Sequence, residues 1–127
     1  KHWTEKRNEA FDSSIVYFRK AAEAHPEDVP TLEQFGTVAA LTNRYDEAAG
    51  AFGKLSELVP SRAEYPRSVG DFNLRLKNFD QAIAAYEKTV TIDPTDVETW
   101  ERLKSLYHEQ GMPQKEAEVD KKLNGLK

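Results

Sequence analysis

The sequence NFDQAIAAYEKTVTIDP, residues 78–94, has two counterparts earlier in the chain. RYDEAAGAFGKLSELVP occupies residues 44–60 and AFDSSIVYFRKAAEAHP occupies residues 10–26, so the three segments follow one another at intervals of 34 residues. An aromatic–Asp pair, a small residue, a second aromatic, a lysine and a terminal proline recur at the same places in each segment. Agreement at this many positions indicates an internal repeat.

Each copy also has the periodicity of an amphipathic helix. In residues 78–94 the apolar and small residues Phe79, Ala82, Ile83 and Tyr86 are spaced i, i+3, i+4, i+7, and Pro94 ends the run. Similar patterns along the chain predict an all-α protein without strands. The predicted helices cover residues 10–24, 29–42, 45–58, 62–76, 79–92, 97–110 and 113–124.

The half-unit that precedes each of these segments repeats as well, and its last copy contains W-x-x-L-x-x-x-Y at Trp100, Leu103 and Tyr107. The whole pattern resembles the tetratricopeptide repeat family. This resemblance implies a right-handed α-solenoid of antiparallel helix hairpins. The matching residues are Gly36, Ala48, Phe52, Pro60, Gly70, Ala82, Tyr86, Pro94, Trp100, Leu103 and Tyr107.

The repeat divides the chain, residues 1–127, into one domain of four units. We expect a truncated first repeat (1–28), two full repeats (29–62 and 63–96) and a last repeat (97–127). Residue 1 falls in the middle of a first helix, so the first eight residues are expected to form a short helix that buries Trp3. In the last repeat, Glu116 and Asp120 replace the small residue and the aromatic. This replacement predicts a polar helix that caps the solenoid.

Several residues depart from the pattern. Gly50 and Gly53 lie inside a predicted helix at a cost of about 1 kcal/mol each relative to alanine. They indicate either a weak helix on an outer face or the close approach of a partner's backbone. Pro66 is harmless in a first helical turn but would kink the helix if it lay deeper. Capping boxes are predicted at Ser61–Glu64 and Thr95–Glu98.

Composition excludes several functions. The net charge is −4, which argues against nucleic-acid partners because these need a basic surface. Cysteine is absent, and this excludes disulfides and thiolate sites while leaving the cellular compartment open. No apolar run approaches the roughly 18 residues of a membrane span, so no membrane insertion is expected. The three histidines have no metal-ligand spacing, and no catalytic signature occurs. We therefore expect no enzymatic activity, no metal and no cofactor.

The family resemblance implies that the first helix of each hairpin lines a concave groove that binds a protein or peptide, with the chain acting as an adaptor or assembly scaffold. Arg67, Arg75 and Arg102 are predicted to form a cationic stripe for an acidic partner. The alternative is that these arginines pair with Asp71 and Glu101. The implied lining is Glu33, Gln34, Thr37, Leu41, Arg67, Asp71, Leu74, Arg75, Arg102, Ser105 and His108.

Two other functions are compatible with the sequence: self-association through the truncated first repeat, and a regulatory role within a longer multidomain protein. One specific subfamily is not expected. The clamps that hold acidic chaperone tails use Lys, Asn and Arg at five places, and of these only Arg102 is present here. Glu33 and Glu98 would repel such a tail.

Overall fold

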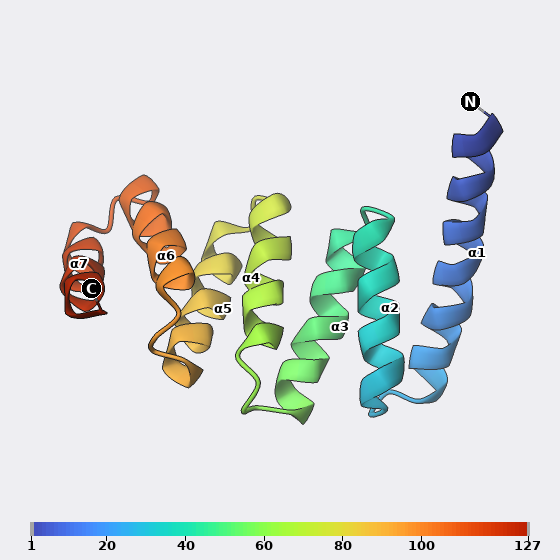
Figure 1. Cartoon of the computed structure of the whole chain (residues 1–127), viewed down its shortest axis with the longest axis horizontal. Coiled ribbons are helices and arrows are strands. Elements are labelled where there is room, and N and C mark those ends of the chain that lie inside the picture. Colours follow the sequence, from blue (N-terminus) through green and yellow to red (C-terminus); the bar gives the residue numbers. More distant parts are fainter. Residues whose placement is uncertain (1, 127) are drawn as a thin grey trace.

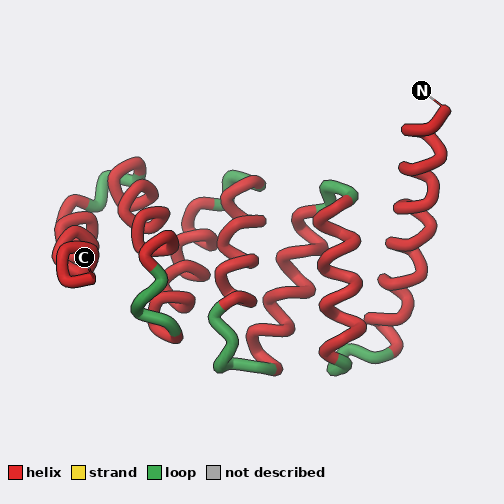
Figure 2. The backbone as a smooth tube through the Cα atoms, in the orientation of Figure 1, coloured by secondary structure: helices red, strands yellow, loops and turns green. Residues whose placement is uncertain are grey.

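The computed structural model describes the backbone of residues 2–126 and the side chains of residues 13–126. Its helices follow one another along the long axis of the molecule (Figure 1). Short loops join them, and residues 2–126 contain no strand (Figure 2). The predicted all-α solenoid of antiparallel hairpins is confirmed. The helices are α1 (His2–Ala24), α2 (Val29–Leu41), α3 (Tyr45–Leu58), α4 (Glu64–Arg75), α5 (Phe79–Ile92), α6 (Val97–Glu109) and α7 (Pro113–Leu126).

The predicted bounds of α2 to α7 agree with the structure to within two residues at either end. The prediction for the N-terminal segment is wrong, because α1 is one continuous helix and not a short helix followed by one over 10–24. Residues 2–24 contain neither glycine nor proline, so nothing in them interrupts a helix. The predicted burial of Trp3 lies outside the side chains that the structure describes.

The first helix of each hairpin ends in the same way. Asn43, Lys77 and Gly111, which are 34 residues apart, have positive φ angles of 61°, 62° and 67°. The N–H of the residue after each of them donates to the carbonyl five residues earlier, at 2.8–2.9 Å. The left-handed residue and the hydrogen bond from the N–H that follows it satisfy the last carbonyl groups of the helix, and the chain reverses direction there.

The helix starts differ from their prediction. Asp28 and Asp96 precede α2 and α6, and the carboxylate of each accepts from the backbone N–H three residues later, at 3.2 and 3.1 Å. The predicted capping box Thr95–Glu98 is therefore wrong, because Asp96, a better cap, lies one residue further on. The box Ser61–Glu64 is also wrong, because α4 begins at its glutamate without a side-chain cap. Pro66 lies in the first turn, where it is tolerated.

Two glycine–aromatic contacts join the helices of the inner hairpins. The ring of Phe52 lies against Gly36 in the α2–α3 hairpin, and Tyr86 lies against Gly70 in the α4–α5 hairpin. A Cβ atom on Gly36 would stand 2.7 Å from the Phe52 ring, and one on Gly70 would stand 2.5 Å from the Tyr86 ring. Both distances are too short for any side chain, so the rings occupy the space that the glycines leave empty.

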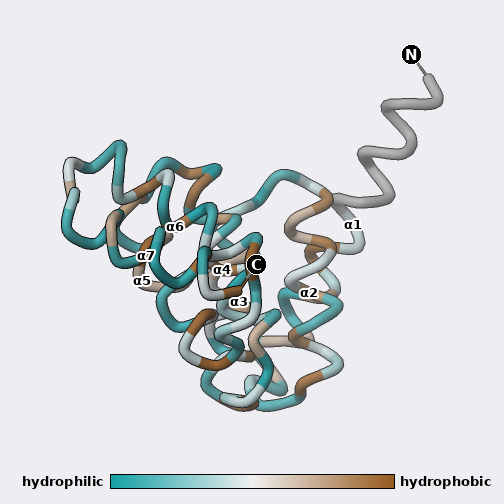
Figure 3. Tube along the Cα trace, turned by 60° about the vertical axis from the view of Figure 1, so that its left-hand side comes forward, coloured by the Kyte–Doolittle hydropathy of each residue, from teal (hydrophilic) through white to brown (hydrophobic). Residues whose placement is uncertain are grey.

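The α6–α7 hairpin uses polar contacts at the corresponding places. Lys104 and Asp120 replace the glycine and the aromatic, and their Nζ and Oδ1 atoms are 2.6 Å apart. Glu116, at the place of the buried alanine, lies 3.2 Å from His108. Apolar residues remain interspersed with hydrophilic ones along the helices (Figure 3).

None of the helices in residues 2–126 is both long and apolar enough to cross a lipid bilayer.

Candidate interaction groove

Four of the predicted groove residues lie around two adjoining hollows on α4, α6 and α7. Leu74, Arg102 and Ser105 line a hollow of about 370 Å³ between α4 and α6. Ser105 and His108 line a second hollow, of about 490 Å³, over α6 and α7. The structure thus brings together part of the predicted groove. The other lining residues are Glu98, Glu101, Lys104, Leu106, Glu109 and Glu116.

The four predicted residues of α2 line neither hollow. Gln34, Thr37 and Leu41 are exposed, and Leu41, at 61% exposure, offers a large apolar side chain to solvent. Glu33 is half-buried and faces Tyr65. Burial raises the pKa of the Tyr65 hydroxyl, and the nearby Glu33 carboxylate raises it further. Glu33 therefore contacts the core, and the other three remain available at the surface.

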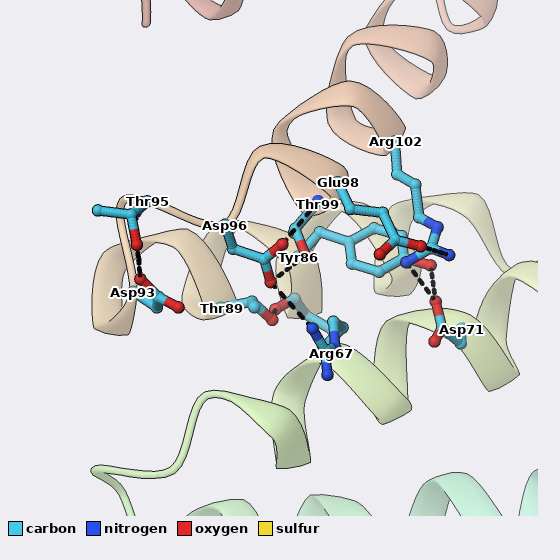
Figure 4. A network of polar contacts seen from close by, with 11 residues as sticks. Arg67, Asp71, Tyr86, Thr89, Asp93, Thr95, Asp96, Glu98, Thr99 and Arg102 are labelled. Atoms are coloured by element: carbon cyan, nitrogen blue, oxygen red, sulfur yellow. Dashed lines mark hydrogen bonds and ion pairs between the residues drawn. The ribbon is translucent and has the colours of Figure 1, made fainter. Parts of the chain in front are cut away.

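Arg67 pairs with the residue that caps α6. Its Nη1 donates to Oδ2 of Asp96 at 3.3 Å (Figure 4), and the Asp96 side chain is 10% exposed. Burial works against ionisation of this carboxyl, but hydrogen bonds from Thr99 together with the Arg67 guanidinium outweigh it and lower its pKa. Arg67 therefore ties the start of α4 to the start of α6.

Arg102 lies in a network that connects α4, α5 and α6 (Figure 4). Its guanidinium is 2.6 Å from Glu98 and 3.5 Å from Asp71. The hydroxyl of the buried Tyr86 donates to the same oxygen of Asp71, at 2.5 Å. Burial raises the pKa of Tyr86, and the Asp71 carboxylate raises it further, so the phenol stays protonated at neutral pH. The network fixes both Asp71 and Arg102 in place.

Arg75, at the other end of α4, contacts neither of these networks. Its guanidinium carbon lies 5.2 Å from the centre of the Tyr45 ring, and Nη1 donates to the Tyr45 hydroxyl at 3.3 Å. The three arginines of the predicted stripe thus have separate partners within the chain. These contacts favour the alternative of internal pairing, with Glu98 in place of Glu101, and the binding of an acidic partner by the stripe stays a prediction.

The two hollows have an acidic lining instead. Four glutamates face two cations, Arg102 and Lys104, which gives a net charge of −2 with His108 neutral. The cations are already paired, Arg102 as above and Lys104 with Asp120. Glu101 and Glu109 form no ion pair with any side chain that the structure describes. These two carboxylates are exposed, and so they are available to a ligand.

Six residues that line the hollows are absent from the predicted lining: Glu98, Glu101, Lys104, Leu106, Glu109 and Glu116. A pattern in the sequence nevertheless pointed to Glu109: Glu101, Ser105 and Glu109 are spaced i, i+4, i+8 and therefore share one face of α6. The hydroxyl of Ser105 and the apolar side chains of Leu74 and Leu106 complete a surface that suits an apolar side chain flanked by cationic groups. Residues 13–126 contain no cluster of three metal-ligating side chains.

Comparison with known proteins gives the same fold. The family model of the tetratricopeptide repeat matches residues 68–96. A crystal structure of MamA superimposes with a TM-score of 0.74 over 97% of this chain and 72% of that chain, at 23% identity. Another MamA structure gives a TM-score of 0.78 over 92% of this chain and 64% of that one, at 20% identity.

Two curated relatives are similar in sequence. Superkiller protein 3 of Schizosaccharomyces pombe is 27% identical over 108 residues, which cover 80% of this chain and 8% of the relative. Small glutamine-rich tetratricopeptide repeat-containing protein 2 of Saccharomyces cerevisiae is 27% identical over 92 residues, covering 72% of this chain and 27% of the relative. The chain therefore spans less than a third of the length of these relatives. The repeat period, the helix hairpins and these similarities together support a tetratricopeptide repeat fold, and proteins built from this repeat are in general non-enzymatic protein–protein interaction modules.

Proposed function

We propose that the chain binds a segment of a partner protein along α4 and α6, and that this segment carries an apolar side chain flanked by lysine or arginine. The observation that carries the proposal is the pair of adjoining hollows, with Leu74 and Leu106 in the lining and the unpaired Glu101 and Glu109 at the surface. In this role the chain acts as an adaptor or scaffold.

The charge of the lining favours a basic segment over the acidic one expected from the sequence. An acidic segment would have to displace Arg102 from Glu98 and Asp71 to find a cation, leaving those carboxylates without it. A lysine or arginine of the partner meets Glu101 or Glu109 without breaking an existing pair. Complementary charge of this kind raises the rate of association and selects the partner.

The spacing of the two carboxylates sets the form of the ligand. Residues 101 and 109 are eight positions apart on one helix, which corresponds to about 12 Å at 1.5 Å per residue. Cations three or four residues apart on an extended segment span this length, and the apolar side chain between them reaches the hollow near Leu74. On the α2 side, Gln34, Thr37 and Leu41 are proposed to extend the groove along the segment.

A matched pair of synthetic peptides tests the proposal. One is extended, with leucine between two lysines, and the other has glutamates in place of the lysines. We expect the lysine peptide to bind and added salt to weaken this binding. Glu101→Gln and Glu109→Gln should each lower the affinity by a factor of about 1.4 to 5, since exposed ion pairs contribute about 0.2–1 kcal/mol. Glu27→Gln, in the exposed turn between α1 and α2, is the control and should change nothing.

Ser105→Arg tests whether the lysine peptide binds at the two hollows. Ser105 lines both hollows, and an arginine there would fill them and pair with the neighbouring glutamates. We expect this variant to fold normally, because Ser105 is exposed, and to lose the lysine peptide. Retained binding by Ser105→Arg would reject the groove. Preferential binding of the glutamate peptide would leave the groove in place and reject the basic ligand.

A further inference from the structure

The second helices of successive hairpins, α1, α3, α5 and α7, form a second surface in which two of the three gaps are bridged by ion pairs. Between α1 and α3, Arg19 donates to both carboxylate oxygens of Glu47, at 2.6 and 2.7 Å. Between α5 and α7, Glu87 lies 3.6 Å from Lys115 and also accepts from the hydroxyl of Tyr107. In both gaps a long side chain therefore crosses from one helix to the other.

The middle gap, between α3 and α5, lacks this bridge. Gly53 lies 34 residues after Arg19 and 34 before Glu87, so it occupies the place of the bridging residue but has no side chain. The residue opposite is Gln81, at the place of Glu47 and Lys115. What remains is a cleft of about 360 Å³, large enough for a bulky side chain.

The lining of the cleft defines what it would accept. Pro66 and Val69 of α4 contribute apolar side chains to it, and Asn73 of the same helix contributes a buried amide. Ala84 and Ala85 of α5 also line the cleft. Ser56 also lines the cleft, is 3% exposed, and its Oγ has no hydrogen-bond partner among the side chains and backbone that the structure describes. A buried hydroxyl without a partner is unusual in a folded protein. Glu57 and Lys88, of opposite sign, contribute no net charge to the lining.

The glycines of α3 permit close approach from outside. A Cβ atom added to Gly50 or Gly53 would meet nothing within 4 Å, so internal packing does not require glycine at either place. This separates them from Gly36 and Gly70, where a neighbouring ring leaves no room for a Cβ. Glycine weakens a helix, and here it exposes backbone beside the open cleft.

We infer that the α3–α5 cleft is a second docking site, in which a tyrosine from a partner protein's helix takes the place of the missing bridge. An aromatic ring suits the apolar side chains of Pro66 and Val69, and its hydroxyl reaches the exposed amide of Gln81. The tyrosine hydroxyl is uncharged, which matches a lining in which the charges of Glu57 and Lys88 cancel. The bare backbone at Gly50 and Gly53 receives the partner's helix beside the inserted ring.

Nuclear magnetic resonance with matched probes tests this site in the full chain. The probes are a short helical peptide with one tyrosine on its exposed face, the same peptide with phenylalanine, and N-acetyl-L-tyrosinamide. We expect saturable shifts of the Gly53, Ser56 and Gln81 amide signals, with binding of the phenylalanine peptide weaker by about two- to tenfold, the effect of one hydrogen bond. Gln81→Ala should narrow this difference between the two peptides.

A variant that copies the bridged gaps closes the cleft. Gly53→Arg combined with Gln81→Glu reproduces the Arg19–Glu47 pair, and it should fold as the parent does and bind none of the probes. Retained binding by this variant, or no saturable shift with the tyrosine peptide, would overturn the site. Equal binding of both peptides would overturn recognition of the hydroxyl. Binding of the free amide as tight as that of the peptide would overturn docking of a helix.

Discussion

The α4–α5 and α6–α7 hairpins turn through a left-handed residue at the same place, Lys77 and Gly111, but their helices are held together differently. In α4–α5, Tyr86 packs on Gly70, and Ala82 is fully buried between helices. In α6–α7 the equivalent pairs are Lys104 with Asp120 and His108 with Glu116, all partly exposed. The repeat therefore specifies the path of the chain. The residues at the positions of Gly70, Ala82 and Tyr86 specify how closely the helices pack and whether the surface between them is solvated.

This difference explains where the candidate groove lies. Close packing on Gly70 buries Tyr86, and its hydroxyl fixes Asp71 and, through it, Arg102. The polar hairpin leaves Glu101 and Glu109 exposed beside that fixed network. Along α6, the network of Tyr86, Asp71 and Arg102 thus lies beside the exposed carboxylates of Glu101 and Glu109.

The largest effect is expected from moving the polar residue of one hairpin into the other. Ala82→Glu would bury a carboxylate at a place with 0% exposure, and an uncompensated buried charge costs about 3–5 kcal/mol. We expect this variant to be mostly unfolded, or to unfold at a much lower urea concentration, when followed by circular dichroism. The α6–α7 hairpin tolerates glutamate at the equivalent place because Glu116 is only half-buried and faces His108.

The matched control reverses the change in the polar hairpin. Glu116→Ala removes a carboxylate that is already solvated, and its urea midpoint should stay close to that of the parent. If the urea midpoint of Ala82→Glu is the same as that of the parent, the helix register and the proposed equivalence of the two hairpins are both wrong.

The glycine–aromatic contact gives the next largest effect. Gly70→Ala places a Cβ 2.5 Å from a ring carbon of Tyr86 that cannot move away freely, and overpacking of this kind costs about 1–3 kcal/mol. Helix propensity alone predicts the opposite, a gain of about 1 kcal/mol. Chemical denaturation of Gly70→Ala decides which contribution is larger.

Gly50→Ala is the control for that substitution, because nothing lies within 4 Å of its added Cβ. It should stabilise the chain by up to about 1 kcal/mol through helix propensity alone. If Gly70→Ala and Gly50→Ala both raise the free energy of unfolding, the Tyr86 ring moves aside without cost. The close packing of Tyr86 on Gly70 would then contribute nothing to stability.

Sequence reasoning predicted the fold well because its signal is repeated. Apolar spacing at 3.6 residues and a proline at the end of each copy placed α3 and α5 within the bounds that the structure gives. Two errors had local causes. Asp96, and not Thr95, caps α6. The N-terminal segment is continuous with α1 because it contains neither glycine nor proline to interrupt the helix.

The site was predicted less well, because charge pairing depends on distances between helices. Arg67, Arg75 and Arg102 share the inner helices, but their side chains reach Asp96, Tyr45, and Glu98 with Asp71. Only Arg102 and Glu98, which are four residues apart on one helix, form a pair that spacing alone could have indicated. The open α3–α5 cleft needs a comparison of three equivalent gaps, which the sequence contains but does not place in space.

A smaller effect is expected at the junction of the two hairpins, where Arg67 of α4 meets the cap of α6. Asp96→Ala removes the carboxylate that accepts from the N–H of Thr99, and loss of such a cap costs about 0.5–2 kcal/mol. Asp96→Asn keeps a capping oxygen and loses only the charge, so it should be destabilised less. Thermal unfolding of the two variants at neutral pH measures the difference.

The sign of the pH dependence follows from the lowered pKa of Asp96. The contribution of its charge is present above the unfolded value, about 3.9, and is lost as the pH falls through the lower folded value. The gap in unfolding free energy between parent and Asp96→Asn should therefore close on acidification below about pH 4. A gap that stays constant across this range would assign the effect to packing.

The smallest effect is expected from the contact that replaces the buried ring. Lys104 and Asp120 are 2.6 Å apart, but their side chains are 43% and 48% exposed, so water screens the pair and restricting two flexible side chains offsets much of the attraction. Lys104→Ala, Asp120→Ala and the double variant form a cycle whose coupling free energy isolates this contact. We expect the coupling to be small at low salt and to vanish at high salt. A coupling that persists at high salt would mean that this pair is shielded and holds α7 to α6 as firmly as the Gly70–Tyr86 contact holds α5 to α4, and the contrast between the two hairpins would disappear.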